Sequence, residues 1–339
     1  MHAKRATTKL IVVSLAVVAL TSKWASGQSA DDLLKRGQEA AAKKDLDRAI
    51  ADFTEAIRLD PKHPAPFYNR GCLWEQKREP DRAIADFDQV IRLDPNHAPS
   101  FYHRGVSWQQ KGEHDRAIAD LDQASRLGPK VAASFYVRAY SWEKKGEHDK
   151  AIADCDQAIH LDPKVAVSFS QRGFSWQRKG DHDRAIIDLD QAIRLDPKDA
   201  LTYFYRGFSR QQRGEHDKAI ADFTEAQQFG LGRSTLFYYR GYSWLQKNED
   251  DRAIADFDKA LQLDPEHPIG YLNRGFCWQR EGDDDRAIAD FDKALQLDPK
   301  YARAHYCRCF SWSRKGEDDK ADADYKEAVR LDPEMTFLK

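Results

Sequence analysis

The sequence predicts an all-α fold, an α-solenoid in which antiparallel helix pairs stack one on another. The first observation is a fixed period of 34 residues, marked by Pro61, Pro95, Pro129, Pro163, Pro197, Pro265, Pro299 and Pro333. A constant period of this size is typical of stacked supersecondary units. The second observation is that each period holds two amphipathic segments, and the third is that no period contains an insertion.

Nine units follow from Ala30, and a short tail of residues 336–339 remains. Leu231 fills the one place in the series that lacks a proline. The predicted unit boundaries are 30–63, 64–97, 98–131, 132–165, 166–199, 200–233, 234–267, 268–301 and 302–335.

The second unit illustrates the two helices. Its first helix carries an apolar face at helical spacing, formed by Phe67, Gly71 and Trp74. Its second helix has a broader apolar stripe, formed by Ala83, Ile84, Phe87, Val90 and Ile91. Pro95 ends that helix, because the residue before a proline is pushed out of the helical region.

This pattern resembles the tetratricopeptide repeat. The third unit shows the residues that carry the resemblance, which are Phe101, Gly105, Trp108, Ala117, Leu121, Ala124 and Pro129. The resemblance extends from residue 30 to about residue 335. It implies a right-handed superhelix whose first helices line a concave groove that binds extended or helical peptides.

The predicted groove is rich in aromatic rings. The fifth and ninth places of the units face it, and they hold Tyr68, Tyr102, Tyr136, Tyr140, Phe174, Phe204, Phe208, Tyr238, Tyr242 and Phe276, with Tyr306 and Phe310 in the last unit. Aromatic side chains are enriched at protein interfaces. We therefore expect a non-catalytic scaffold that binds a protein or peptide there. The alternative for the rings is packing between neighbouring first helices.

Two other binding roles remain open. The first is a carbohydrate or polymer-export helper whose rings stack on sugars, and the second is self-association through the ends of the stack. Relatives that grip the acidic tails of cytosolic chaperones use Lys and Asn at the two groove places. This chain has Tyr68 and Cys72, or Tyr102 and Val106, there, so that activity is not expected.

Seven tryptophans recur at one place of the unit and are expected to lie in the core, namely Trp74, Trp108, Trp142, Trp176, Trp244, Trp278 and Trp312. On that basis Trp176→Ala should cost about 3–5 kcal/mol of folding stability.

The sixth unit departs from the pattern with Arg210 in place of Trp and Gly-Leu-Gly at 230–232. That segment is interpreted either as a hinge or as simple sequence drift. In the ninth unit Asp322 replaces a recurrent Ile, which predicts a polar end cap.

Every unit also carries one Arg and one Asp at fixed places. Arg70 is expected to lie near Asp86, or near the equivalent Asp of a neighbouring unit, because the helices are antiparallel. A repeated Arg–carboxylate pair would fix the register of the helices, whereas unpaired arginines would form an anion-binding ladder. The matched acid in every unit favours the structural interpretation.

Residues 1–27 have the layout of a secretory signal peptide. Basic residues precede an apolar run at 10–20, and small residues follow. A run of eleven residues spans only about 16 Å as a helix, short of the roughly 30 Å hydrocarbon core. We predict cleavage between Gly27 and Gln28, export to the periplasm or the medium, and no membrane span in the mature chain. An uncleaved N-terminal anchor is the alternative.

The charge balance argues against nucleic acid as a partner, because Lys plus Arg is 54 and Asp plus Glu is 56. His114, His148, His182 and His216 lie one unit apart, too far to share an ion, so they are expected in solvated turns without metal. The five cysteines do not form a disulfide framework, although one bridge from Cys277 into the last unit is an alternative. No catalytic set stands outside the repeat, so no enzyme activity and no cofactor are expected.

Overall fold

The computed structural model describes residues 29–128 and 131–337. Within these residues it contains eighteen α-helices, one short 3-10 helix and no strand. The first helices of the nine pairs are α2 (Ala30–Ala42), α4 (Pro64–Gln76), α6 (Ala98–Gln110), α8 (Ala132–Lys144), α10 (Ala166–Arg178), α12 (Ala200–Gln212), α14 (Ser234–Gln246), α16 (Pro268–Glu281) and α18 (Ala302–Arg314). The second helices are α3 (Leu46–Leu59), α5 (Pro80–Leu93), α7 (His114–Leu127), α9 (His148–Leu161), α11 (His182–Leu195), α13 (His216–Gln228), α15 (Asp250–Leu263), α17 (Asp284–Leu297) and α19 (Asp318–Leu331). The 3-10 helix η1 follows at Pro333–Phe337.

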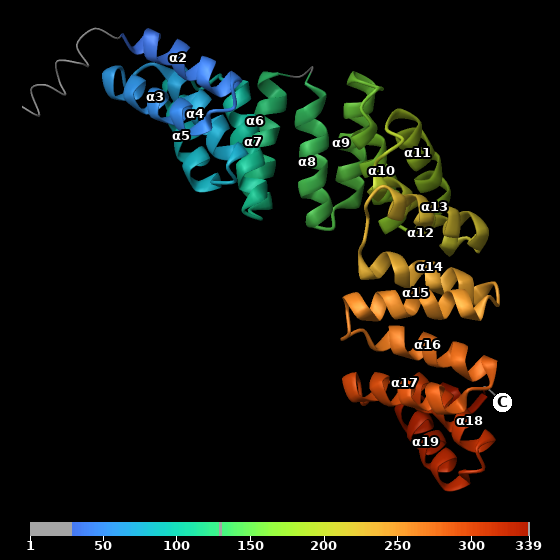
Figure 1. Ribbon diagram of the computed structural model, residues 1–339. Coiled ribbons are helices and arrows are strands. Elements are labelled where there is room, and N and C mark those ends of the chain that lie inside the picture. The colour runs from blue at the N-terminus through green and yellow to red at the C-terminus, as the bar shows by residue number, and fades with distance from the viewer. Residues whose placement is uncertain (1–28, 129–130, 338–339) are drawn as a thin grey trace, which may run out of the picture. The chain divides into compact units, whose positions relative to one another are not determined.

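The helices form two compact units, one ending at Leu161 and the other beginning at Asp162. Within each unit, every helix packs on the helix that follows it, as Figure 1 shows. The predicted all-α stack of helix pairs is confirmed. The predicted signal peptide and Pro129 lie outside the described residues.

Seven of the nine helix pairs close around one glycine and one large apolar residue, and the fourth and ninth pairs carry Ala139 and Cys309 at the glycine place. A Cβ atom placed on Gly71 would lie 2.8 Å from Phe87 Cε1, and one on Gly275 would lie 2.7 Å from Phe291 Cε1. Only glycine permits such an approach, and the ring it admits is fully buried. The equivalent fully buried side chains of other pairs are Phe53, Leu121, Leu189, Phe223 and Phe257.

The tryptophans are placed differently from the prediction. They are only partly buried, and a cation from the start of the second helix covers each indole. The guanidinium of Arg184 lies 4.5 Å from the ring centroid of Trp176, and that of Arg286 lies 3.7 Å from Trp278. Cation–π attraction and contact with the aliphatic stem of the cation therefore hold the indole. The prediction that tryptophan lies in the core is right only in part: Trp142, Trp244 and Trp278 pack against core clusters, but the fully buried position belongs to the Phe or Leu opposite glycine.

The predicted Arg–Asp pairing is confirmed in all nine helix pairs. Arg70 Nε donates to Asp86 Oδ2 at 2.8 Å, and Arg274 donates to Asp290 through Nε and Nη2 at 2.8 and 2.6 Å. The remaining pairs are Arg36–Asp52, Arg104–Asp120, Arg138–Asp154, Arg172–Asp188, Arg206–Asp222, Arg240–Asp256 and Arg308–Asp324. The guanidinium often reaches the preceding second helix as well, as in Arg104 Nη1 to Asp88 Oδ1 at 2.6 Å. The arginines thus fix register within and between repeats.

Glutamine forms a second link between neighbouring repeats, which the sequence analysis missed. Gln211 Nε2 donates to Tyr239 O and to Ser243 Oγ, both at 2.6 Å. Gln109, Gln177 and Gln279 make the same two bonds with the first helix that follows each of them. Buried amide and hydroxyl groups are thereby satisfied across each of these junctions.

In the irregular sixth repeat, a buried leucine fixes the segment that follows α13. Gly230 has a φ of 95° and reverses the chain after α13. Leu231 then buries its side chain against Leu236 and Phe237. Arg210, in the place of tryptophan, donates to Asp222 Oδ2 at 2.9 Å. In the last repeat, Asp322 is exposed and pairs with Lys326, as the predicted polar cap requires.

All five cysteines are free thiols, so the alternative of a bridge from Cys277 into the last repeat is wrong. Cys277, Cys307 and Cys309 are buried. Burial raises the pKa of Cys277 to about 12 and that of Cys307 to about 11. Because the thiolate is the reactive form, the raised pKa values of Cys277 and Cys307 disfavour a nucleophilic role for these two thiols.

Candidate protein-binding face

The predicted groove rings lie on the first helices, and their environments differ. Tyr140 and Phe310 are exposed at 43% and 46%, and the other rings are partly buried. Tyr68 packs against His97, with the ring centroids 5.1 Å apart, and Tyr238 packs against His267 at 4.9 Å. These two tyrosines contribute mainly to packing between helices, as the alternative interpretation proposed.

Three of the predicted rings gather in one hollow of about 400 Å³. We call it the ring hollow, and its lining is Phe174, Gln177, Arg178, Gly180, His182, Phe204, Tyr205, Phe208, Gln212 and Tyr239. Phe174 lies 4.7 Å from Tyr205, and Phe208 lies 5.0 Å from Tyr239, between ring centroids. The rings therefore pack between neighbouring first helices and also line an open depression.

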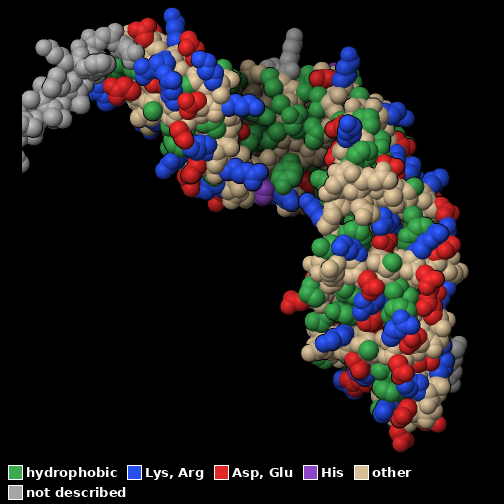
Figure 2. Space-filling model, viewed as in Figure 1, with side chains coloured by type: hydrophobic (Ala, Val, Ile, Leu, Met, Phe, Trp, Pro, Cys, Tyr) green, Lys and Arg blue, Asp and Glu red, His purple; other side chains and the backbone are tan. Residues whose placement is uncertain are grey.

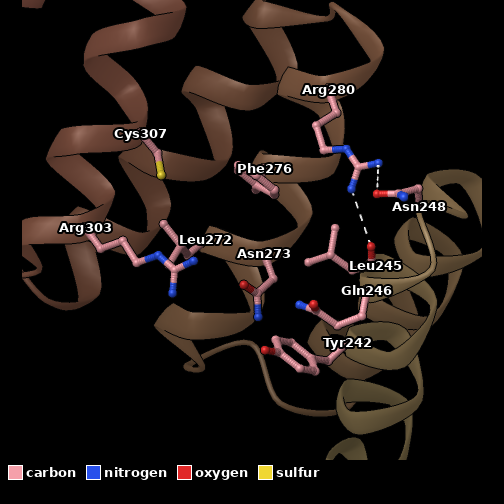
Figure 3. Close-up of a pocket in the computed structure, with 10 residues that line it drawn as sticks. All are labelled: Tyr242, Leu245, Gln246, Asn248, Leu272, Asn273, Phe276, Arg280, Arg303 and Cys307. Carbon is pink, nitrogen blue, oxygen red and sulfur yellow. Dashed lines mark hydrogen bonds between the residues drawn. The ribbon is translucent and has the colours of Figure 1, made fainter. Parts of the chain in front are cut away.

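Two more predicted rings, Tyr242 and Phe276, line a smaller hollow of about 170 Å³ between α14, α16 and α18 (Figure 3). We call it the arginine hollow. Its other lining residues are Leu245, Gln246, Asn248, Leu272, Asn273, Arg280, Arg303 and Cys307. Helix α14 is shared by both hollows, because Tyr239 and Tyr242 lie one turn apart on it. The ring hollow is lined mainly from α10 and α12 and the arginine hollow mainly from α14, α16 and α18, so α14 is the helix that contributes to both.

Polar groups in the arginine hollow are held in place. Arg280 Nη2 donates to Asn248 Oδ1 at 2.6 Å, and its Nη1 donates to Leu245 O at 3.4 Å (Figure 3). Arg280 Nε also lies 3.2 Å from Asp250 Oδ2. Asn273 is 5% exposed, and its Nδ2 donates to the hydroxyl of Tyr238 at 3.1 Å. The hollow thus combines apolar walls with fixed polar groups, which is the usual composition of a binding site.

The hydroxyls of Tyr102 and Tyr238 remain protonated at neutral pH. Burial raises the pKa of Tyr102 to about 12, and the neighbouring Tyr136 contributes. Burial likewise raises the pKa of Tyr238 to about 12. These groups can donate or accept hydrogen bonds, but they are poorly suited to proton transfer near pH 7.

The four repeated histidines are not in solvated turns, contrary to the prediction. They are the first residues of α7, α9, α11 and α13, and each is partly buried. The ring of His182 lies 6.3 Å from that of Phe208 in the next repeat. The Nδ1 atoms of His182 and His216 are buried and have no hydrogen-bond partner in residues 29–128 and 131–337. Within those same residues, no group of three or more His, Cys, Asp or Glu side chains is arranged to hold a metal ion.

The structure brings together only part of the predicted site. Phe174, Phe204 and Phe208 share one hollow, and Tyr242 and Phe276 share the other, whereas Tyr68, Tyr102, Tyr136, Tyr140 and Tyr238 line neither. Sequence reasoning missed the polar lining, above all Arg303. The sequence could have pointed to this residue, because Arg303 is the only basic residue at the second place of any unit.

The family model for the tetratricopeptide repeat matches residues 34–98, 104–166 and 177–234, and two further models of the same repeat match 234–267 and 268–301. The chain belongs to the tetratricopeptide repeat family. Members of this family are generally non-catalytic scaffolds that bind proteins or peptides, and the fold is consistent with that role. No curated protein matches the chain. In the part of this family member that the structure describes, no helix is long and apolar enough to cross a bilayer.

Solved structures support the same fold. A tetratricopeptide repeat protein from Parabacteroides merdae has a TM-score of 0.57 and 19% identity, over 74% of this chain and 99% of the other. The C-terminal part of a repeat protein from Cytophaga hutchinsonii has a TM-score of 0.55 and 18% identity, over 70% and 97%. The Cut9–Hcn1 hetero-tetramer of APC/C matches with a TM-score of 0.53 and 17% identity, over 90% and 73%.

Proposed function

We propose that this protein is an exported scaffold that binds a segment of another protein on the face of its first helices. The observation that carries the proposal is the convergence of Phe174, Phe204 and Phe208 in the ring hollow. Aromatic walls offer apolar contact at a small cost in side-chain entropy. A chain of the Cut9–Hcn1 hetero-tetramer has a similar fold and takes part in a protein assembly, which agrees with the proposed role.

The mixture of acidic and basic side chains on the surface favours specific binding over nonspecific electrostatic attraction. Acidic and basic side chains are interspersed over the face visible in Figure 2. The formal net charge of the chain is −2. Such a surface gives little nonspecific attraction to nucleic acid or other polyanions. Selectivity must then come from shaped depressions such as the ring hollow.

Peptide selection tests the proposed face. The full chain is presented to a random peptide library displayed on phage, and enriched peptides are measured by fluorescence anisotropy. We expect Phe208→Ser to weaken binding at least about tenfold, which corresponds to about 1.4 kcal/mol. Ile187→Ser is the matched control, because Ile187 is 66% exposed and lies on second helix α11. Equal binding by wild type and Phe208→Ser would refute the proposed face.

Export is a separate part of the proposal and rests on the composition of residues 1–27. Expression of the full chain in a bacterial host, followed by N-terminal sequencing of the exported product, should give a first residue of Gln28. A product that begins at Met1, or that stays in the cytoplasm, would contradict the proposed export.

A further inference from the structure

The arginine hollow carries a positive charge that its own lining does not neutralise. No Asp or Glu is among the residues that line it. We propose that this hollow binds the carboxylate of an Asp or Glu side chain within the bound peptide. This inference rests on the proposed function, and it names the chemistry of the partner segment.

Arg303 provides the uncompensated charge. It is exposed, it is the second residue of α18, and it has no hydrogen bond or ion pair within residues 29–128 and 131–337. The other two arginines of α18 differ, because Arg308 pairs with Asp324 at 2.6 Å and Arg314 pairs with Asp284 at 2.5 Å. Arg303 is therefore the guanidinium of this helix that remains available to a ligand.

Arg280 lies on the other side of the arginine hollow, in a fixed position (Figure 3). Its position is fixed by Leu245 O, Asn248 and Asp250, so its guanidinium needs no reorganisation when a ligand enters. The ion pair with Asp250 gives this guanidinium a partner of opposite charge. Arg280 thus shapes the hollow, and Arg303 supplies the net attraction.

The neutral lining suits a carboxylate that belongs to a peptide. Leu272 and Phe276 form an apolar wall, and the amides of Asn273 and Gln246 lie at the same hollow in Figure 3. An apolar wall excludes water and strengthens a charge-assisted hydrogen bond. The volume of about 170 Å³ accommodates one side chain.

The ring hollow could bind a second residue of the same peptide. Tyr239 of the ring hollow and Tyr242 of the arginine hollow both lie on α14, and the proposal is that one extended segment occupies both hollows. The expected ligand is therefore a peptide with an apolar or aromatic residue near an acidic residue. The aromatic residue would enter the ring hollow, and the acidic residue would reach Arg303.

The test uses the same phage-displayed random peptide library on the full chain. Peptides enriched by wild type should contain Asp or Glu next to an apolar residue. Synthetic versions with Gln in place of Glu should bind at least about tenfold more weakly, and added salt should reduce the affinity of the Glu form only. Arg303→Gln should remove this preference for Glu, because it removes the charge and keeps a polar side chain.

Arg194→Gln is the control, since Arg194 is exposed at the end of α11 and, among the residues that the structure describes, donates only to Gln191, at 3.0 Å. It makes the same change in net charge and should preserve the preference for Glu. Selected peptides that bind through Phe208 but lack acidic residues would overturn the carboxylate assignment and leave the proposed function standing. An unchanged preference for Glu in Arg303→Gln would also overturn it. If wild type enriches no peptide, both proposals fail.

Discussion

The clearest stability test concerns the carboxylate that fixes register in the eighth repeat. Asp290 accepts two hydrogen bonds from Arg274, at 2.8 and 2.6 Å, and its side chain is 7% exposed. Hydrogen bonds that involve a charged group contribute about 1.5–3 kcal/mol each. Removing one partner of a buried pair costs about 3–5 kcal/mol, since the other charge remains buried. Arg274 keeps a second partner in Asp258, so we expect Asp290→Ala to cost about 2–4 kcal/mol.

Asp258 provides an internal control for that variant. It accepts a hydrogen bond at 2.5 Å from the same guanidinium, but its side chain is 56% exposed. Exposed ion pairs contribute about 0–1 kcal/mol, because water screens them. Asp258→Ala should therefore leave the stability of α16 and α17 nearly unchanged. The two variants separate the effect of burial from that of charge.

Local hydrogen exchange is the appropriate assay. Stability in a repeat array is a sum of local and nearest-neighbour contributions, so one global transition need not report one repeat. The exchange rates of amides in α16 and α17 give the local free energy of opening. A loss below about 0.5 kcal/mol in Asp290→Ala, or an equal loss in both variants, would refute the role assigned to the buried carboxylate.

Three further predictions concern packing and pH. Gly275→Ala should lower the local stability by about 1–3 kcal/mol in the same exchange assay, because the added methyl would overlap Phe291. In the same exchange assay, Trp176→Ala should lower the local stability less than Leu189→Ala in the same repeat, which should cost about 2–5 kcal/mol, since the indole is only partly buried; an equal loss would place Trp176 in the core after all. Burial lowers the pKa of His182 and His216 below the usual value of 6.5, so the folded state binds fewer protons than the unfolded state and stability should fall as the pH drops below about 6.5. The double variant with Gln at both positions should flatten that decline in urea titrations; an unchanged decline would assign it to other groups.

The sequence by itself determined the architecture of this protein. A period of 34 residues, repeated without insertion, fixes the number and order of the helices, since each unit must bury its apolar faces against its neighbours. The Arg–Asp pairing was also predictable. The two residues lie at constant places on adjacent antiparallel helices, where only short-range packing is needed to bring them together.

Only the tertiary structure decided which side chains from neighbouring helices contact one another. Trp176 could not be assigned from its apolar character, because its burial depends on whether Arg184 covers it. Gln211 reaches groups 28 and 32 residues away, across a junction that periodicity alone does not orient. The arginine hollow exists because Tyr242, Phe276 and Arg303, on three different first helices, face one space. Such a space depends on the distances and rotations between helices, which the hydrophobic pattern of a single helix leaves undetermined.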